Sequence, residues 1–165
     1  MAGTGSEIRN KNRFHVFYDE NNDGTMVELG SFKTVGGLAL ETDVTEWKTG
    51  DMDAMRKLPG TTKYPPVTLH RGFDTDTKLK DWYDAVWNLS NGAGAAEYRK
   101  TVIVYVVNRT GTVFKKIRVE AAWPSKYQAD DLDGMSSDPW LEQVELQHAG
   151  WDYEPVAADE KVPGY

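Results

Sequence analysis

Two clusters of carboxylates are the first candidates for chemistry in this sequence. The run Asp-Glu-Asn-Asn-Asp-Gly at residues 19–24 places oxygen-bearing side chains at positions 1, 3 and 5 and a glycine at position 6, as a calcium loop does. Position 12 of such a loop is Gly30, so the glutamate that closes the coordination sphere is missing. The run therefore predicts a hairpin turn. The second cluster, Asp130, Asp131 and Asp133, predicts an exposed acidic loop.

The other residue types that carry catalysis or bind metals are absent or scattered. The 165 residues include no cysteine, and the three histidines, His15, His70 and His148, are far apart. None has the His-x-x-x-His spacing of a helical zinc site, and the sequence has neither a phosphate-binding glycine loop nor a Gly-x-Ser-x-Gly elbow. We therefore expect no metal, no cofactor and no catalytic residue, and hence not an enzyme.

The hydrophobic pattern predicts a mainly β (α+β) chain. Apolar residues at helical spacing, Leu79, Trp82, Val86 and Leu89 among them, predict one helix over residues 76–90. Alternation with a period of two predicts seven strands, over residues 13–18, 25–32, 38–45, 64–73, 101–107, 112–122 and 141–149. This combination favours a barrel or sandwich of antiparallel sheets with the helix packed against it.

The pattern also predicts how the chain is divided. One domain is expected over residues 13–153, after a flexible N-terminal segment, 1–12, and before a polar C-terminal tail, 154–165. Inside the domain, periodicity is lost over residues 48–62, and a second polar loop is expected over 123–139. Because long loops without structure are uncommon in compact domains, residues 48–62 are expected to be functional or intermolecular.

The charge of the chain limits the possible partners. The formal net charge is −7 and the isoelectric point about 5.0, which argues against sequence-specific nucleic-acid binding because phosphate contacts need clustered Lys and Arg. The longest apolar run, residues 101–107, is far too short for a membrane-spanning helix, so we expect no membrane insertion. The N-terminus lacks the apolar core of a signal peptide, so synthesis in a bacterial cytoplasm is expected.

Three blocks of sequence carry a more specific signal. They are Val-Gly-Gly-Leu at 35–38 with the acidic strand 41–47, then Leu-Pro-Gly-Thr-Thr-Lys-Tyr at 58–64 with 67–73 and 79–83, and then Trp-Pro-Ser-Lys-Tyr at 123–127 with 142–150. In this order and at these distances, they make residues 35–152 resemble the tail-tube proteins of contractile bacteriophages and the inner-tube proteins of phage-tail-like contractile injection systems.

The resemblance implies a β-barrel-like pair of packed antiparallel sheets with one flanking α-helix, as in tail-tube and type VI secretion tube proteins. It implies hexameric rings that stack head to tail into a hollow tube, with a contractile sheath, baseplate or hub proteins, a cap protein and cargo in the lumen, either effector protein or DNA, as further partners. The particle would be a phage tail or an injection machine, either extracellular or anchored to a membrane. In this family the long loop after the acidic strand, here 48–62, reaches a neighbouring subunit or ring.

These implications lead to two sets of candidate residues. The expected contacts between subunits are Met52, Met55, Arg56, Leu58, Pro59, Tyr64, Trp123, Lys126 and Tyr127. The expected acids of the lumen or of a ring face are Glu41, Asp43 and Glu46.

Two alternative functions remain open at the level of sequence. The six tryptophans and the barrel pattern are compatible with a small monomeric module that binds carbohydrate or an apolar ligand. A glycan-cleaving enzyme would need a pair of carboxylates, and no pair is distinguished by its context in the sequence.

Overall fold

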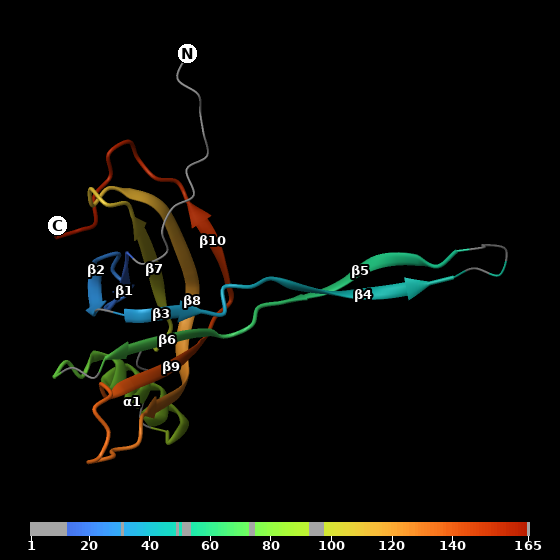
Figure 1. Ribbon diagram of the computed structural model, residues 1–165. Coiled ribbons are helices and arrows are strands. Elements are labelled where there is room, and N and C mark those ends of the chain that lie inside the picture. The colour runs from blue at the N-terminus through green and yellow to red at the C-terminus, as the bar shows by residue number, and fades with distance from the viewer. Residues whose placement is uncertain are drawn as a thin grey trace.

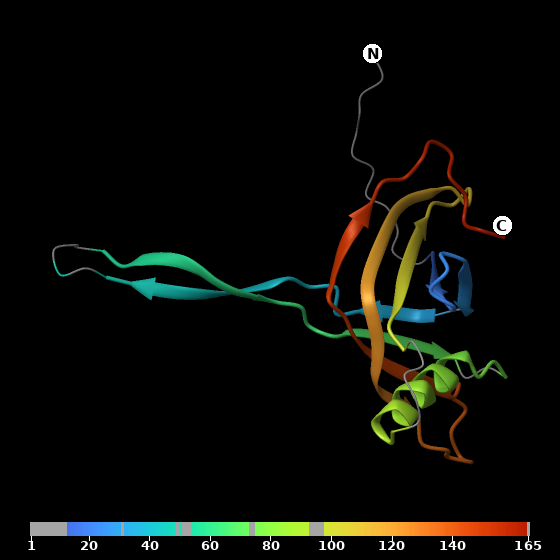
Figure 2. The ribbon, with the colours of Figure 1, turned by 180° about the vertical axis from the view of Figure 1, so that it is seen from behind.

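The computed structural model describes residues 13–30, 32–48, 50, 54–72, 75–92 and 98–164. They form a β-rich body from which one long hairpin projects (Figures 1 and 2). The elements in chain order are β1 (Phe14–Asp19), β2 (Met26–Gly30), β3 (Phe32–Gly36), β4 (Glu41–Trp47), β5 (Arg56–Lys63), β6 (Val67–Gly72), α1 (Lys78–Ser90), β7 (Lys100–Val107), β8 (Val113–Ala129), β9 (Leu141–Gln147) and β10 (Gly150–Glu154). The expected mainly β fold with antiparallel sheets and one helix is confirmed.

Strand β8 organises the body because it belongs to two sheets. Its first part pairs with β7 on one edge and β10 on the other, and β1 and β2 continue this first sheet beyond β7. Its second part, from Trp123 onwards, pairs with β9, and β6 and β3 complete the second sheet. Between the two parts, Ala121 has a φ of 49°, in the left-handed region, and the long strand curves through the body (Figure 2).

The main core lies between the two sheets and under the helix. Val102 and Val119 of the first sheet and Leu69 and Val144 of the second are almost fully buried in it. Leu79 and Trp82 bring the apolar stripe of α1 onto the same cluster, as the sequence predicts. The indole N–H of Trp82 donates to the carbonyl of Tyr98 at 2.7 Å, so the buried ring leaves no polar atom unsatisfied.

A second, smaller cluster covers the opposite face of the first sheet. Phe17, Tyr105 and Val113 lie in it, and Val162 of the C-terminal segment closes over them with only 3% of its surface exposed. Lys161 forms a β-bridge with Thr112, and the amide of Val113 donates to the carbonyl of Glu160 at 2.8 Å. The prediction of a plain polar tail over 154–165 is therefore wrong for this part, which packs on the body.

The other differences from the expected elements follow from weak sequence signals. Residues 56–63 are strand β5, whereas a loop is predicted for 48–62. Strand β8 continues to Ala129 through Pro124, where a loop is predicted from 123 onwards. Strand β10 is not predicted at all.

The turn that follows β1 agrees with the hairpin turn predicted for residues 19–24. The carboxylate of Asp19 accepts hydrogen bonds from the amides of Asp23 at 3.1 Å and Gly24 at 2.9 Å.

Candidate self-association surface

Strands β4 and β5 form an arm that leaves the body as a two-stranded ribbon (Figure 1). They pair with each other in an antiparallel register, from Glu41 opposite Lys63 to Trp47 opposite Arg56, and they join no other strand of the described chain. The seven residues of β4 extend about 23 Å, at about 3.3 Å per residue. The arm therefore reaches well beyond the surface of its own body.

Every residue of both arm strands is exposed to solvent. Four large apolar side chains on the arm or next to it are exposed: Val44 at 63%, Trp47 and Leu58 at 49% each, and Met55, directly before β5, at 61%. An isolated two-stranded hairpin is at best marginally stable in water, because it has no core on either face. The arm thus has the composition of a contact surface and lacks the packing that would stabilise it within one chain.

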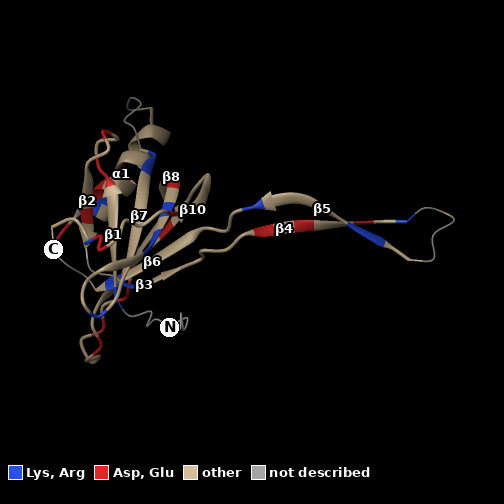
Figure 3. Cartoon of the chain, turned by 90° about the horizontal axis from the view of Figure 1, so that it is seen from above, with Lys and Arg blue, Asp and Glu red and all other residues tan. Residues whose placement is uncertain are grey.

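The charges of the arm are largely paired within it. Lys63 Nζ lies 2.7 Å from a carboxylate oxygen of Asp43, and Lys57 Nζ lies 3.9 Å from one of Glu46. Figure 3 shows acidic positions in red along β4 and basic positions in blue towards the two ends of β5. The third acid of β4, Glu41, lies opposite Lys63 in the register. The three acids expected in the lumen or on a ring face thus lie on a ribbon that carries its own countercharges. Their place in an assembly remains a prediction.

The root of the arm is held firmly on the body. Gly37 has a φ of 79°, and a Cβ atom at this residue would lie 2.1 Å from the carbonyl oxygen of Pro66. Trp151 of β10 donates its indole N–H to the carbonyl of Ala39 at 3.2 Å. On the other strand, the ring of Tyr64 packs beside Gly150 and lies 5.9 Å from that of His148. The direction of the arm is therefore set by contacts on both of its strands.

The structure divides the expected contact residues into two groups. Met55, Arg56, Leu58 and Pro59 lie exposed on the arm, and Tyr64 stands at its root with 41% of its surface exposed. Met52 lies outside the described residues. The other three, Trp123, Lys126 and Tyr127, lie in the second part of β8, away from the arm.

These three residues of β8 have different surroundings. Lys126 is exposed, and its Nζ lies 3.8 Å from Glu145. Trp123 is half-buried and packs edge-on against Tyr98. Tyr127 faces the core, where its hydroxyl donates to Glu142 at 2.7 Å, and burial together with this bond raises the pKa of Tyr127 to about 12. Tyr127 therefore has a role within the subunit.

Val44 and Trp47 are arm residues that the sequence analysis does not single out as contacts. Both lie in β4, the strand whose acids the sequence makes prominent. The sequence signal for them is that two large apolar residues stand in a segment rich in Thr and Glu. This signal indicates a contact surface only once it is known that neither face of the strand is covered by the body.

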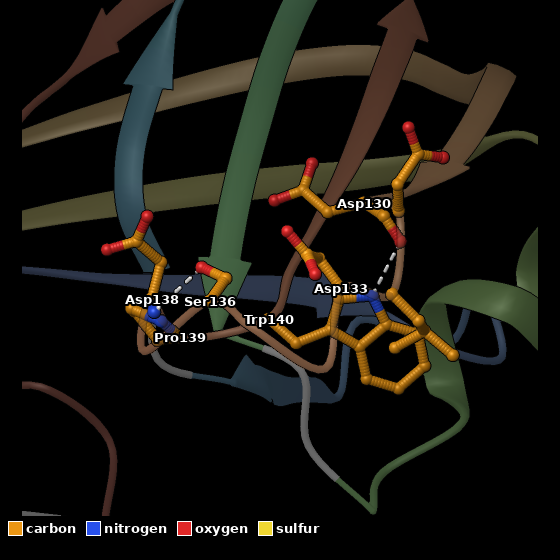
Figure 4. Close-up of a pocket in the computed structure, with 8 residues that line it drawn as sticks. Asp130, Asp133, Ser136, Asp138, Pro139 and Trp140 are labelled. Atoms are coloured by element: carbon orange, nitrogen blue, oxygen red, sulfur yellow. Dashed lines mark hydrogen bonds between the residues drawn. The ribbon is translucent and has the colours of Figure 1, made fainter.

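The acidic loop between β8 and β9 lines a hollow of about 350 Å³ (Figure 4). Asp130, Asp131, Asp133 and Asp138 line it, and the indole of Trp140 donates to the carbonyl of Asp130 at 2.7 Å. Among the described residues, no three His, Asp or Glu side chains are placed to hold a metal ion. The loop is acidic and exposed, as predicted.

The tryptophans do not gather into one binding platform. They lie on β4, on α1, on β8, on β10 and in the loop before β9, and three of the indoles donate to backbone carbonyls of the body. The observation that would motivate a carbohydrate-binding module is therefore missing from the fold.

One family of known proteins matches a stretch of this chain that includes both the arm and most of the body. The family model described as T4-like virus tail tube protein gp19 matches residues 10–152. The chain belongs to the T4-like virus tail tube protein family. The family match includes the whole arm and ends within β10, just before the C-terminal segment that covers the first sheet.

Solved structures share the fold of this tail tube protein. A chain in the 6-fold symmetrised baseplate of the anti-feeding prophage superposes with a TM-score of 0.77 at 19% identity, over 93% of this chain and 100% of that one. A chain of the extended sheath-tube complex of the extracellular contractile injection system PVC gives 0.71 at 22% identity, over 90% and 93%. An Hcp protein gives 0.56 at 12% identity, over 89% and 95%. A search among curated proteins finds no match.

One further observation concerns membranes. In the part of the chain that the structure describes, no helix has the length and apolar character needed to cross a bilayer.

Proposed function

We propose that this tail tube protein is the structural subunit of the inner tube of a contractile particle. Six copies form a ring, and rings stack head to tail into a hollow tube that a surrounding sheath drives through a target envelope. The tube conducts cargo, either effector protein or DNA. Membership of the tail tube family supports the general role, and the arm supports the assembly.

The observation that carries the proposal is an arm with no core of its own. Val44, Trp47, Met55 and Leu58 expose apolar surface that the body of the same chain does not cover. Burial of this surface against a neighbouring copy would contribute about 25 cal/mol for each Å² removed from water. Self-association would thus bury the apolar surface that the arm leaves exposed in a single chain.

The position of the arm favours rings and stacks over closed pairs. It projects from one side of the body (Figures 1 and 2), so a copy that receives it elsewhere on its surface still has its own arm free. Such a head-to-tail contact closes into a ring when its rotation closes, and otherwise it continues as an open stack.

The remaining partners follow from the same role. The solved chains with this fold come from a baseplate, a tube-terminating cap and a sheath-tube complex, which supports sheath, baseplate or hub, and cap proteins as partners of this subunit. The particle would be a phage tail or an extracellular or membrane-anchored injection machine, assembled in a bacterial cytoplasm.

The test is direct imaging of the purified protein. We expect rings or tubes with a central hole in negative stain, and a sedimenting species that is several times the monomer mass. The matched variant replaces residues 43–61 by an Asn-Gly turn joining Thr42 to Thr62, which face each other in the arm register. It should remain folded and monomeric. A wild-type protein that stays monomeric at high concentration would contradict the proposal, and so would a shortened variant that assembles normally.

A further inference from the structure

The β8–β9 loop, residues 130–140, carries the two most exposed large apolar side chains among the described residues. Met135 is 95% and Leu132 is 78% exposed. The loop is shaped by its own hydrogen bonds, because the amides of Met135 and Ser136 both donate to Asp133, at 2.9 Å to the carboxylate and at 3.2 Å to the carbonyl. The β8–β9 loop therefore presents a preformed apolar surface that the rest of the described chain leaves uncovered.

The β8–β9 loop and the arm lie at opposite ends of the second sheet. In the antiparallel register of β6 and β9, Val67 lies opposite Leu146 and Gly72 lies opposite Leu141. The arm returns to the body just before Val67, whereas the loop ends at Leu141. Figures 1 and 2 show the arm leaving one side of the body and the orange loop near the opposite side. A second copy displaced along the strands of this sheet would therefore bring its loop to the arm of the first copy.

The two faces of the arm differ in charge. Directly paired residues share a face, and successive pairs alternate between the faces. The pairs Trp47–Arg56 and Thr45–Leu58 lie on one face, here called the Trp47 face, and the pairs Glu46–Lys57 and Val44–Pro59 lie on the other. On the second face, the base and the acid lie 3.9 Å apart and neutralise each other. On the Trp47 face, Arg56 is exposed and forms no ion pair with any acid of the described residues.

The β8–β9 loop and the Trp47 face are complementary in both apolar character and charge. The loop contains four aspartates and no lysine or arginine. These carboxylates line its hollow together with Trp140. A guanidinium that entered the hollow would meet carboxylates beside an aromatic ring, which are the two kinds of group that bind arginine best. The exposed side chains of Leu132 and Met135 would meanwhile cover apolar surface of the Trp47 face.

We propose that the β8–β9 loop is the surface that receives the arm of another copy of this chain. Leu132 and Met135 pack on the Trp47 face, and Arg56 reaches the aspartates of the loop. The proposal rests on the proposed tube function and identifies the acceptor that this function requires. Because donor and acceptor lie at opposite ends of one sheet, each copy gives its arm to one neighbour and receives the arm of another, so the contact repeats in one direction.

Cysteine cross-linking tests the contact directly, because the chain has no native cysteine. Leu58→Cys and Met135→Cys in the same chain place one thiol on the Trp47 face and one on the loop. After assembly and treatment with a short bismaleimide, we expect a ladder of covalent multimers on a denaturing gel. Val44→Cys with Met135→Cys is the matched control, since its arm thiol lies on the other face, and it should give several-fold less multimer.

The outcomes separate this proposal from the tube function. Double variants that form rings or tubes without cross-linked multimers would overturn the proposal and leave the tube function intact. Equal ladders from the Leu58 and Val44 variants would overturn it as well, because the contact would then not select a face of the arm. If the wild type forms neither rings nor tubes, the tube function fails and the proposal fails with it.

Charge reversal provides a second test that needs no cysteine. Met135→Lys places a positive charge opposite Arg56, and Arg56→Glu places a negative charge opposite the aspartates. We expect each change to raise the protein concentration needed for assembly by about tenfold or more, because like charges then meet. The two changes together set a lysine against a glutamate, so the double variant should assemble at a lower concentration than either single variant.

Lys57→Glu is the control for charge reversal on the arm. It makes the same kind of change on the other face and should have a smaller effect than Arg56→Glu. Sedimentation measures assembly, and thermal melting confirms that each variant is folded. Wild-type assembly of Met135→Lys would overturn the proposal, and so would a double variant in which the two single effects simply add.

Discussion

Arg71 of β6 and Glu142 of β9 face each other across the second sheet and form an ion pair inside the main core. Arg71 is 1% and Glu142 4% exposed, and the Arg71 Nε donates to Glu142 Oε1. The two remaining nitrogens of the guanidinium donate to the carbonyls of Leu29 and Asp76, each at 2.9 Å. One buried side chain thus joins the second sheet to the end of β2 and to the segment that precedes α1.

Removal of one partner of this pair should destabilise the subunit strongly. Glu142→Ala leaves the Arg71 charge buried without its countercharge, and we expect a loss of about 3–5 kcal/mol in the free energy of unfolding. Tyr127→Phe removes one hydrogen bond to the carboxylate and should cost about 1.5–3 kcal/mol. Urea unfolding at neutral pH measures both. Equal stability of Glu142→Ala and the wild type would show that the pair contributes little.

The arm should govern assembly and leave folding almost unchanged. Leu58→Lys puts a charge on the apolar surface of the arm, next to Lys57, and we expect rings to be lost with a shift of the melting temperature no larger than a few degrees. Trp87→Lys is the control, because it makes the same kind of change at an exposed position of α1. Sedimentation and thermal melting separate the two effects. A melting temperature that falls as sharply as assembly would assign Leu58 to the subunit's own stability.

The direction of the arm should depend on Gly37. Gly37→Ala puts a Cβ atom against the backbone of Pro66 and forces a residue with a side chain into a φ of 79°. We expect lower stability and impaired assembly together, because the root of the arm must shift. Gly36→Ala is a suitable control, since a Cβ there meets nothing within 4 Å. Similar melting and assembly of the two variants would argue against a fixed root.

The C-terminal segment should contribute measurably to stability through Val162. Val162→Ala removes two methyl groups from the second cluster, at about 0.8 kcal/mol each, so a loss of about 1–2 kcal/mol is expected. Leu132→Ala removes apolar atoms from an exposed side chain and should leave the unfolding free energy within about 0.5 kcal/mol of the wild-type value. If Val162→Ala is as stable as this control, the segment is not anchored as described.

Acid should loosen the same segment. The Glu160 carboxylate accepts hydrogen bonds from the Ala157 amide at 2.9 Å and, through its other oxygen, from Lys116 Nζ at 3.0 Å, and these lower the pKa of Glu160. A lowered folded-state pKa contributes stability that is fully present above the unfolded value, about 4.3, and is lost as the pH falls through the folded value. Amide exchange of Val113, corrected for its intrinsic pH dependence, should therefore accelerate below about pH 4.

Lys116, the partner of Glu160 in this ion pair, makes the stability of the C-terminal segment depend on pH in the alkaline range. Burial disfavours the charged form of Lys116, but the hydrogen bond to Glu160 and the charges of Glu154 and Glu160 outweigh burial and raise the pKa of Lys116. Tyr105 packs beside it, and burial raises the pKa of Tyr105. This contribution is present below the unfolded value and is lost only in strong alkali. In the Glu160→Gln variant, the amide of Val113 should exchange faster than in the wild type at pH 7, and its exchange should no longer accelerate below about pH 4. An unchanged acid response in that variant would assign the loosening to another group.

The body of the subunit could be predicted from the sequence because its elements have one covered face. The stripe Leu79, Trp82 and Val86 on α1 and the alternation in β9 both arise from burial on one side. The same reasoning explains the failures. Residues 56–63 have both faces in solvent, so no alternation exists for a pattern to detect. Pro124, in the interior of β8, is typical of a strand end or a loop, and the shift in register beside it accommodates the proline.

The candidate surface was less predictable than the fold. The family resemblance identified the region of the arm, and Met55 and Leu58 do lie exposed there. It could not separate them from Tyr127, because all three residues are apolar or aromatic and lie in the blocks that carry the resemblance. The packing of Tyr127 against the main core and the contact of its hydroxyl with Glu142 show that it faces inward. The sequence predicts the acids of β4 without the lysines that pair with them, since the pairing depends on β5, which the sequence presents as a loop.

The sharing of β8 by both sheets has a mechanical consequence. A load that pulls one sheet along β8 relative to the other cannot be relieved by sliding at an interface, since a single covalent strand of 17 residues continues from one sheet into the other. The load instead falls on the backbone ladders with β7, β10 and β9, whose many hydrogen bonds are stretched side by side and must break together. A subunit built in this way resists shear between its two sheets and moves as a rigid part.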